Sequence, residues 1–156
     1  MQSVFKCLFA VIISAVAFSC TNKRLFDEVQ KISPDGWHKT DSISFIFQIS
    51  DTSQAYNILL HLRNKTSYRN SNLWLFINTT APNGETITDT VEFFLAEPSG
   101  RWLGKGLGAV NSMLVPYKTN IRFPYRGIYR FDFRQAMRED TLEGIIDIGM
   151  RVQLHK

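Results

Sequence analysis

The stretch Ile43-Ser44-Phe45-Ile46-Phe47-Gln48-Ile49 decides the fold. Every second side chain, beginning with Ile43 and ending with Ile49, is large and apolar, and this period of two is typical of a β-strand with one buried face. The polar run Ser50-Asp51-Thr52-Ser53 then interrupts the pattern, as a turn between strands would. The sequence therefore predicts a strand over residues 43–49.

The chain after this stretch repeats the pattern of short strands and turns. The Asn83-Gly84 pair, for example, is typical of a β-hairpin turn. About eight short strands predict an all-β domain, an antiparallel β-sandwich, with a closed barrel as the alternative. The other strands are expected at residues 56–63, 73–79, 86–96, 110–118, 120–123, 127–134 and 144–154.

Two segments depart from simple alternation. In residues 73–79, Trp74 and Phe76 lie opposite the other apolar side chains, which indicates a central strand or a strand with a contact surface. Residues 134–143 are rich in helix-forming side chains and predict a helix of about two turns.

The N-terminus has the pattern of a lipoprotein signal peptide. Lys6 precedes an apolar run over residues 7–18, which is too short for the roughly 20 residues of a spanning helix. The pair Ser19-Cys20 resembles the bacterial lipobox, in which the cysteine sulfur receives diacylglycerol and the preceding peptide is removed. An ordinary cleaved signal or an uncleaved anchor are the alternatives.

These observations divide the chain into three parts. Residues 1–19 are the expected signal peptide, residues 20–36 a tether that ends in the turn Ser33-Pro34-Asp35-Gly36, and residues 37–156 the β-sandwich domain. Cys20 is the expected lipidation site and attaches the protein to a membrane. Basic rather than acidic residues follow it, which favours the periplasmic face of the outer membrane as the location.

Charge and cysteine content exclude several classes of protein. The net charge of +4 is small and evenly distributed, so no nucleic-acid partner is expected. The two cysteines, Cys7 and Cys20, lie in or next to the signal peptide. The mature domain therefore has no disulfide and no zinc site with cysteine ligands.

No pattern of catalytic or metal-binding residues emerges. The histidines are His38, His61 and His155, which are far apart in sequence, and His61 is expected on the solvated face of a strand. The carboxylates Asp89, Glu92 and Glu97 cluster around one strand and are better explained as a polar sheet face than as a glycosidase pair. We therefore expect no catalytic residues, no metal and no cofactor, and we do not expect an enzyme.

The most unusual stretch of the mature chain is Arg101-Trp102-Leu103-Gly104-Lys105-Gly106-Leu107-Gly108. Phosphate-binding glycines precede a helix, whereas these precede a strand-like run. They can form tight bulges at a sandwich edge that Trp102 covers, or a loop that binds a partner. The sequence leaves both alternatives open for the loop that contains Trp102, Gly104, Lys105, Gly106 and Gly108.

Aromatic side chains offer an alternative function. Sugars stack on aromatic faces, so exposed tryptophans and tyrosines could form a platform that binds carbohydrate or peptidoglycan, although most tryptophans in a sandwich belong to its core. The side chains in question are Trp37, Trp74, Trp102, Tyr68, Tyr117 and Tyr125.

An ordered set of short motifs runs along the whole mature chain. The most specific are GRWLGKGLG at residues 100–108, QAMR at 135–138 and LEGI at 142–145. The others are Ser19-Cys20, Trp37 and residues 45–52, 56–58, 62–64, 71–76, 82–84 and 89–92. In this order the motifs resemble the GldH family of gliding motility lipoproteins of Bacteroidetes.

The resemblance implies a lipid-anchored, non-enzymatic component of the envelope machinery for gliding motility and the linked type IX secretion system. Its expected partners are other envelope proteins of that machinery. The only functional residue that the resemblance transfers is Cys20.

Overall fold

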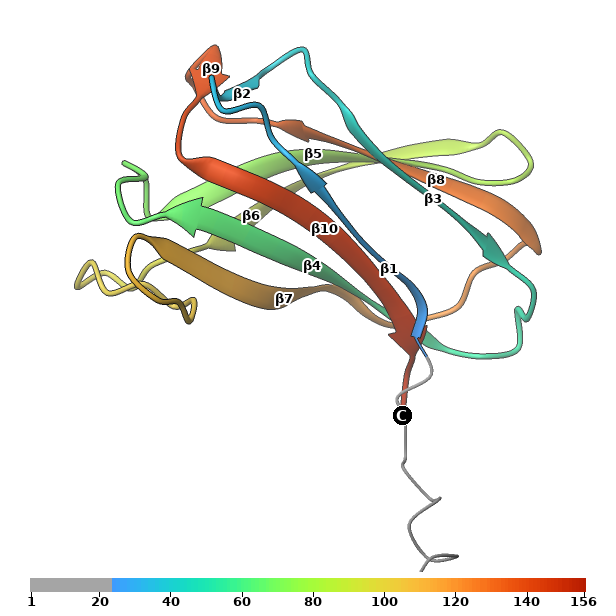
Figure 1. The fold of residues 1–156 in the computed structure, drawn as a ribbon. Coiled ribbons are helices and arrows are strands. Elements are labelled where there is room, and N and C mark those ends of the chain that lie inside the picture. The colour runs from blue at the N-terminus through green and yellow to red at the C-terminus, as the bar shows by residue number, and fades with distance from the viewer. Residues whose placement is uncertain (1–23) are drawn as a thin grey trace, which may run out of the picture.

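The computed structural model describes residues 24–156, and all the regular elements in this range are strands (Figure 1). The expected signal peptide and Cys20 lie outside the described residues. Short loops join the strands in sequence, and no helix among the described residues could cross a membrane. The strands are β1 (Arg24–Lys31), β2 (Trp37–His38), β3 (Ile43–Ile49), β4 (Tyr56–Lys65), β5 (Asn72–Thr80), β6 (Thr86–Phe94), β7 (Val110–Ile121), β8 (Gly127–Gln135), β9 (Thr141–Leu142) and β10 (Ile145–Leu154).

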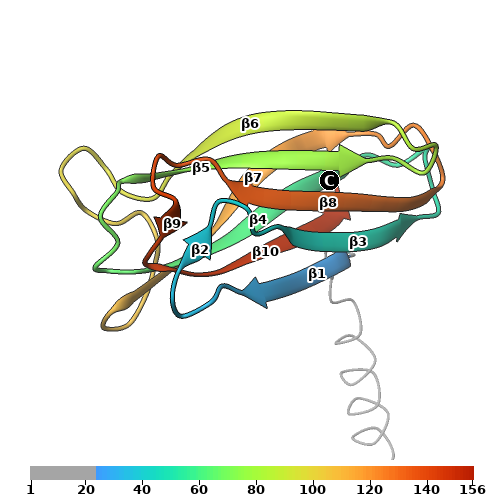
Figure 2. The same ribbon diagram turned by 90° about the horizontal axis from the view of Figure 1, so that it is seen from above.

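The eight long strands form two four-stranded antiparallel sheets that pack face to face (Figure 2). The first sheet has the order β1-β10-β4-β7 and the second the order β3-β8-β5-β6. With the long strands counted along the chain, these orders are 1-8-3-6 and 2-7-4-5, which is the arrangement of a jelly roll. The predicted antiparallel sandwich is confirmed, and the closed-barrel alternative is wrong.

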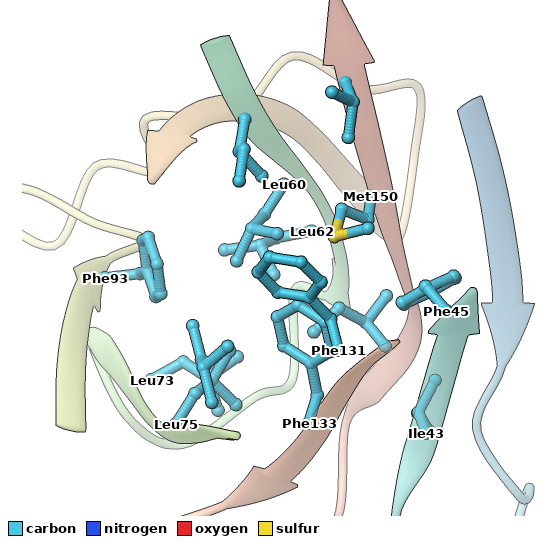
Figure 3. Packing of buried hydrophobic residues seen from close by; sticks show 14 of the residues in the cluster. Ile43, Phe45, Leu60, Leu62, Leu73, Leu75, Phe93, Phe131, Phe133 and Met150 are labelled. Atoms are coloured by element: carbon cyan, nitrogen blue, oxygen red, sulfur yellow. The ribbon is translucent and has the colours of Figure 1, made fainter. Parts of the chain in front are cut away.

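The core lies between the sheets and is built by the alternation that the sequence displays. In β3 the side chains of Ile43, Phe45, Phe47 and Ile49 are buried, as predicted. They meet the inward side chains of β4, β8 and β10 (Figure 3). Each such side chain contributes about 1.5–3 kcal/mol when fully buried, so this interior stabilises the domain without disulfides.

Side-chain contacts join the sheets along both open sides. On one side Gln30 of β1 donates from Nε2 to the backbone oxygen of Ser44 in β3 at 2.6 Å. On the other side Lys118 of β7 contacts Asp89 of β6 at 2.6 Å. Because these are side-chain contacts and not backbone ladders, β1, β3, β6 and β7 are sheet edges.

The small sheet of β2 and β9 covers one end of the core. Trp37 pairs with Leu142 across it, and the indole is only 1% exposed. The indole Nε1 donates to the backbone oxygen of Asp41 at 3.1 Å, which satisfies its one polar group. Trp37 is therefore a core residue.

The boundary predicted between tether and sandwich needs correction. Residues 24–31, expected in the tether, form β1 and pair with β10 from Arg24–Gln153 to Lys31–Asp147. Phe26 packs on Phe45 and Phe47, with ring centroids 6.1 and 5.4 Å away. Because its inner face contributes one aromatic ring beside Glu28 and Gln30, this edge strand shows little alternation. The sandwich therefore begins at Arg24 rather than Trp37.

The helix predicted at residues 134–143 is also wrong. Strand β8 continues to Gln135, and the chain then bends towards β9. The Gln135 side chain is buried and holds the bend, since its Oε1 accepts from Met137 N at 2.7 Å and its Nε2 donates to the Glu139 carbonyl at 2.8 Å. Burial of Gln135 and Leu142 overrides the helical propensity of the segment.

The strands place the loops at two opposite ends of the sandwich (Figure 1). We call the end where the chain enters at Arg24 the proximal end; it carries the loops 50–55, 81–85 and 122–126. The opposite, distal end carries the loops 32–42, 66–71, 95–109 and 136–144.

Candidate interaction surfaces

The glycine-rich loop lies at the distal end, between β6 and β7. Backbone hydrogen bonds hold it in place: Leu103 N donates to the oxygen of Leu95, just after β6, at 2.9 Å, and Lys105 exchanges two bonds of 2.9 Å with Ser112 of β7. Its base is a turn in which Arg101 Nε donates to Glu97 at 3.0 Å, and this contact lowers the pKa of the Glu97 carboxyl. The loop is thus an ordered extension of the sandwich.

The close approach of this loop to β7 explains two of its glycines. A Cβ at Gly104 would lie 3.0 Å from the backbone oxygen of Ser112, and a Cβ at Gly106 only 1.7 Å from that of Val110. Gly108 has a φ of +68°, which other residues rarely adopt. These glycines therefore have a structural role.

The side chains of the same loop divide into an inner and an outer set. Trp102 is partly buried and packs against the core, as the covering role requires. Lys105 is exposed, Leu103 is 47% exposed and Leu107 is 96% exposed. An apolar side chain held fully in solvent by an ordered loop is suited to contact with another protein.

A second surface covers the distal half of the second sheet. Trp74, Phe76 and Phe94 point outward here, and we call these three residues the aromatic face. Trp74 and Phe76 are two residues apart on β5, while Phe94 pairs with Asn72 and is therefore a diagonal neighbour of Trp74. Phe94 alone is 60% exposed, so the face presents a substantial apolar area.

A groove of about 560 Å³ runs beside the aromatic face. Met137 forms part of its wall, and its sulfur accepts a hydrogen bond from Trp74 N at 3.2 Å. The groove thus combines an aromatic ring with amide, guanidinium and carboxylate groups. The lining residues are Asn70, Asn72, Trp74, Ala136, Met137, Arg138 and Glu139.

The aromatic platform predicted from the sequence is not assembled as one surface. Trp37 and Tyr68 are buried, and burial raises the pKa of Tyr68 to about 12. Tyr117 is partly buried, and its hydroxyl donates to Asp89. Tyr125 is exposed at the proximal end, whereas Trp74 lies in the distal half. Of the six predicted side chains, only Trp74 belongs to the aromatic face.

Charged side chains occupy the outer surface of the first sheet. Arg151 Nη2 lies 2.8 Å and His61 Nε2 2.9 Å from the Asp27 carboxylate, and Arg63 lies 2.8 Å from Asp147. We call these five residues the ion-pair face. His61 is therefore on the outward side, as predicted, but it has a carboxylate partner.

The two carboxyls of this face are shifted in opposite directions. Burial raises the pKa of Asp27, but hydrogen bonds from Arg151 and His61 outweigh it, so the net shift is downward. Asp147 is buried, and burial raises its pKa despite the attraction of Arg63. Sequence reasoning missed this network because residues 24–31 were placed in the tether.

The carboxylates clustered in the sequence do not form an opposed pair. Asp89 pairs with Ile77 across the ladder and faces inward, where Lys118 and Tyr117 lower its pKa. Glu92 pairs with Trp74 and faces outward, accepting from Asn72 Nδ2 at 2.5 Å. Within residues 24–156 no three histidine, cysteine or acidic side chains lie close enough to hold a metal ion.

Comparison with known proteins connects this geometry to a family. The family model described as "GldH lipoprotein" matches residues 24–152. The chain is 36% identical to the "Gliding motility lipoprotein GldH homolog" of Christiangramia forsetii, over 98% of both chains. It is 34% identical to the "Gliding motility lipoprotein GldH" of Flavobacterium johnsoniae, over 87% of this chain and 88% of the relative.

Solved structures are more distant. Latent PorU of Porphyromonas gingivalis matches 88% of this chain with 14% of its own length, at 13% identity and a TM-score of 0.34. A family 11 carbohydrate-binding module of Clostridium thermocellum matches 83% of this chain with 82% of its own, at 11% identity and a TM-score of 0.33. Scores this low support no functional inference.

Proposed function

This chain belongs to the GldH lipoprotein family, and from that membership we propose that it is a lipid-anchored, non-catalytic component of the envelope machinery for gliding motility. The match over residues 24–152 carries the proposal. We extend the role to the type IX protein secretion that is linked to this motility. Its partners are then other envelope proteins of the same machinery.

The attachment to the membrane is made through lipid on Cys20. The short apolar run before Cys20 suits a cleaved signal, and each buried acyl methylene contributes about 0.8 kcal/mol. Two or three acyl chains hold a protein on a bilayer without a spanning segment. We place the domain on the periplasmic face of the outer membrane, since Lys23 and Arg24 rather than an acidic run follow the cysteine.

The described surfaces favour binding over catalysis. Three carboxylates that could have formed an acid–base site, Asp89, Glu92 and Glu97, each contact a partner of their own. The glycine-rich loop instead presents Leu107 and Lys105 to solvent at the distal end. We therefore assign the loop Trp102–Gly108 to contact with a partner protein.

Deletion of the gene tests the proposed role directly. In its own host, if that host glides, we expect loss of colony spreading and of type IX cargo export. A chromosomal copy should restore both, and a Cys20→Ser copy should restore neither while the protein leaves the membrane fraction. Intact spreading and export in the deletion strain would contradict the proposal, and membrane-bound, normally processed Cys20→Ser protein would contradict the anchor.

A loop variant tests the contact with a partner. A tagged, crosslinked protein should co-purify envelope proteins, and Leu107→Asp should reduce this recovery because it places a charge at an apolar contact. Thr119→Asp, at an exposed position at the other end of β7, is the matched control. Equal recovery with both variants would remove the loop from the interface.

Binding of glycan, including peptidoglycan, is the second candidate function. It rests on one observation, the position of Trp74 beside a groove lined by Asn70, Asn72, Arg138 and Glu139. Such a groove pairs an aromatic stacking surface with polar groups that fix orientation. A peptidoglycan pull-down and a glycan array should show binding that Trp74→Ala removes and Trp102→Ala, in the glycine-rich loop, leaves unchanged. No binding by the unaltered protein excludes this candidate.

A further inference from the structure

We propose that the proximal end of the sandwich binds the headgroups of anionic phospholipids, in the leaflet that holds the lipid of Cys20, through Arg24, Arg122 and Arg126. This inference rests on the proposed lipidation of Cys20. It adds a second membrane contact that fixes the orientation of the domain.

The length of the tether brings this end to the membrane. Strand β1 begins at Arg24, so only four peptide links separate it from Cys20, and they span at most about 14 Å. The first residue of β1 already pairs with Gln153, so the sheet holds the chain from Arg24 onward. The loops of the proximal end must therefore lie close to the headgroups, while the distal end points away.

The proximal end presents arginines in the direction of the membrane. Arg122 and Arg126 are exposed on the loop between β7 and β8, and they form no ion pair within residues 24–156. Arg24 lies 3.3 Å from Asp27, but its side chain is still 58% exposed, and Asp27 is already bound by Arg151. Basic side chains within a Debye length of an anionic surface are attracted to it.

The acidic residues at the proximal end neutralise only part of its positive charge. Asp51 is engaged in its own turn, where it accepts from Ser53 N at 2.9 Å, although it also interacts with Arg126. Glu85 is exposed on the hairpin loop. Against these two carboxylates stand Arg24, Arg122 and Arg126, together with Lys156 just after β10.

Tyr125 adds an amphipathic ring between the two loop arginines. It is 40% exposed, and its backbone N–H donates to the Tyr129 hydroxyl at 3.1 Å, which fixes the loop. Tyrosine is enriched at the level of lipid headgroups because one end of its ring is apolar and the other polar. A fixed loop that combines two arginines with an exposed tyrosine is better suited to contact with a bilayer surface than to full exposure to water.

The excess of basic side chains is smaller at the distal end. In its loops alone, six exposed or partly exposed acidic side chains stand against five basic ones. The basic residues there are Lys39, Arg69, Arg101, Lys105 and Arg138, and the acidic ones Asp35, Asp41, Glu97, Glu139, Asp140 and Glu143. With the exposed strand-end residues Lys31 and Lys65 included, the distal end has seven basic and six acidic side chains, whereas the proximal end, counted in the same way, has four basic and two acidic ones. The charges of the two ends therefore favour the orientation that the short tether imposes.

The test uses the full lipidated protein in vesicles of phosphatidylcholine, with or without phosphatidylglycerol. A fluorophore is attached to Pro124→Cys in the proximal loop or to the matched exposed proline variant Pro98→Cys in the distal loop. We expect phosphatidylglycerol to reduce quenching by aqueous acrylamide at position 124 by about twofold, and high salt to restore it. Quenching at position 98 should not change.

A charge variant identifies the residues responsible. Arg122→Gln with Arg126→Gln should abolish the effect of phosphatidylglycerol, whereas Arg69→Gln with Arg138→Gln, at the distal end, should retain it. If the protein floats with the vesicles but phosphatidylglycerol has no effect, or if the proximal double variant keeps the effect, the inference is overturned while the anchor stands. If the unaltered protein does not float, the lipid anchor itself fails and the inference fails with it.

Discussion

The solvent-exposed faces of the two sheets carry different kinds of side chain. Both sheets bury one face and expose the other, as alternating strands require. On the first sheet the ion-pair face joins β1, β10 and β4 through Asp27, Arg151 and His61. On the second sheet the aromatic face leaves Trp74, Phe76 and Phe94 partly uncovered.

This difference indicates which face is available to a partner. Charged groups on the ion-pair face already have partners within the domain, and Gly149 at its centre leaves room for the side chains of Val29 and His61, which both pack close to it. Side chains on the aromatic face gain nothing from their exposure unless another molecule covers them. We therefore expect substitutions on the ion-pair face to change mainly stability, and substitutions on the aromatic face to change stability little.

The largest effect on stability is expected at Gly149, beneath the ion-pair face. A Cβ there would lie 2.7 Å from the backbone oxygen of Glu28 and 2.7 Å from Val29 Cγ2, so Gly149→Val should push β1 away and cost about 1–3 kcal/mol. Urea denaturation measures this cost. Thr90→Val, on the outer surface of the second sheet, should stay within about 0.5 kcal/mol. If both variants lowered the free energy of unfolding by the same amount, the two faces would not differ in their contribution to stability.

A smaller loss is expected when the central carboxylate is neutralised. Asp27→Asn removes the charge that Arg151 and His61 bind, and since the Asp27 side chain is only 25% exposed we expect a cost of about 1–2 kcal/mol. Glu28→Gln changes the neighbouring exposed carboxylate, which forms no ion pair in the described part of the chain. If both variants unfold at the same urea concentration, the network does not stabilise the sheet.

The pH dependence of stability should show opposite contributions from the two carboxyls of the ion-pair face. The pKa of Asp27 lies below its ordinary value of 3.8, so its contribution is complete above that value and is lost as the pH falls through the lowered pKa. The pKa of Asp147 is raised, so stability increases as the pH falls from the raised pKa towards 3.8.

Urea midpoints measured against pH separate these terms. Relative to the unaltered protein, Asp27→Asn should reduce the loss of stability at acidic pH. Asp147→Asn should remove the increase in stability that the raised pKa of Asp147 produces as the pH falls. Difference curves of the same sign for the two variants would show that the assigned shifts are incorrect.

The smallest change in stability is expected on the aromatic face. Phe94 is 60% exposed at the end of β6, so Phe94→Ser should alter the free energy of unfolding by about 0.5 kcal/mol or less. The same variant should reduce capture of whichever ligand covers this face, protein or glycan. A large loss of stability would instead show that Phe94 belongs to the core.

The sequence predicts strands well where one face is strongly apolar. The bounds of β3 are as expected. The two strands expected at residues 110–118 and 120–123 are in fact one strand, β7, which ends at Ile121. Strand β1 could not be recognised because Phe26 is its one apolar inward side chain that contacts the core. The alternation of apolar and polar residues assigns side chains to the two faces of a strand but does not identify its neighbours in the sheet. The jelly-roll order of the strands therefore could not be predicted from it.

The candidate surfaces were predicted unevenly for a similar reason. Trp74 and Phe76 stood out because they are apolar on the side of a strand opposite its core residues. Phe94 joins them only through the register of β6 against β5, which no local pattern contains. The bend after Gln135 depends on a buried amide and on Leu142, whereas helical propensity reflects only neighbours along the chain.

The position of β1 has a mechanical consequence. The chain from Cys20 leads directly into this strand, which lies antiparallel to β10 over seven paired residues. Bonds between strands run perpendicular to the strand direction, so tension between the membrane and the distal end acts along β1 and loads the whole ladder in shear. Because β10 also pairs with β4, the load passes into the interior of the sheet and the bonds resist together, instead of opening one after another.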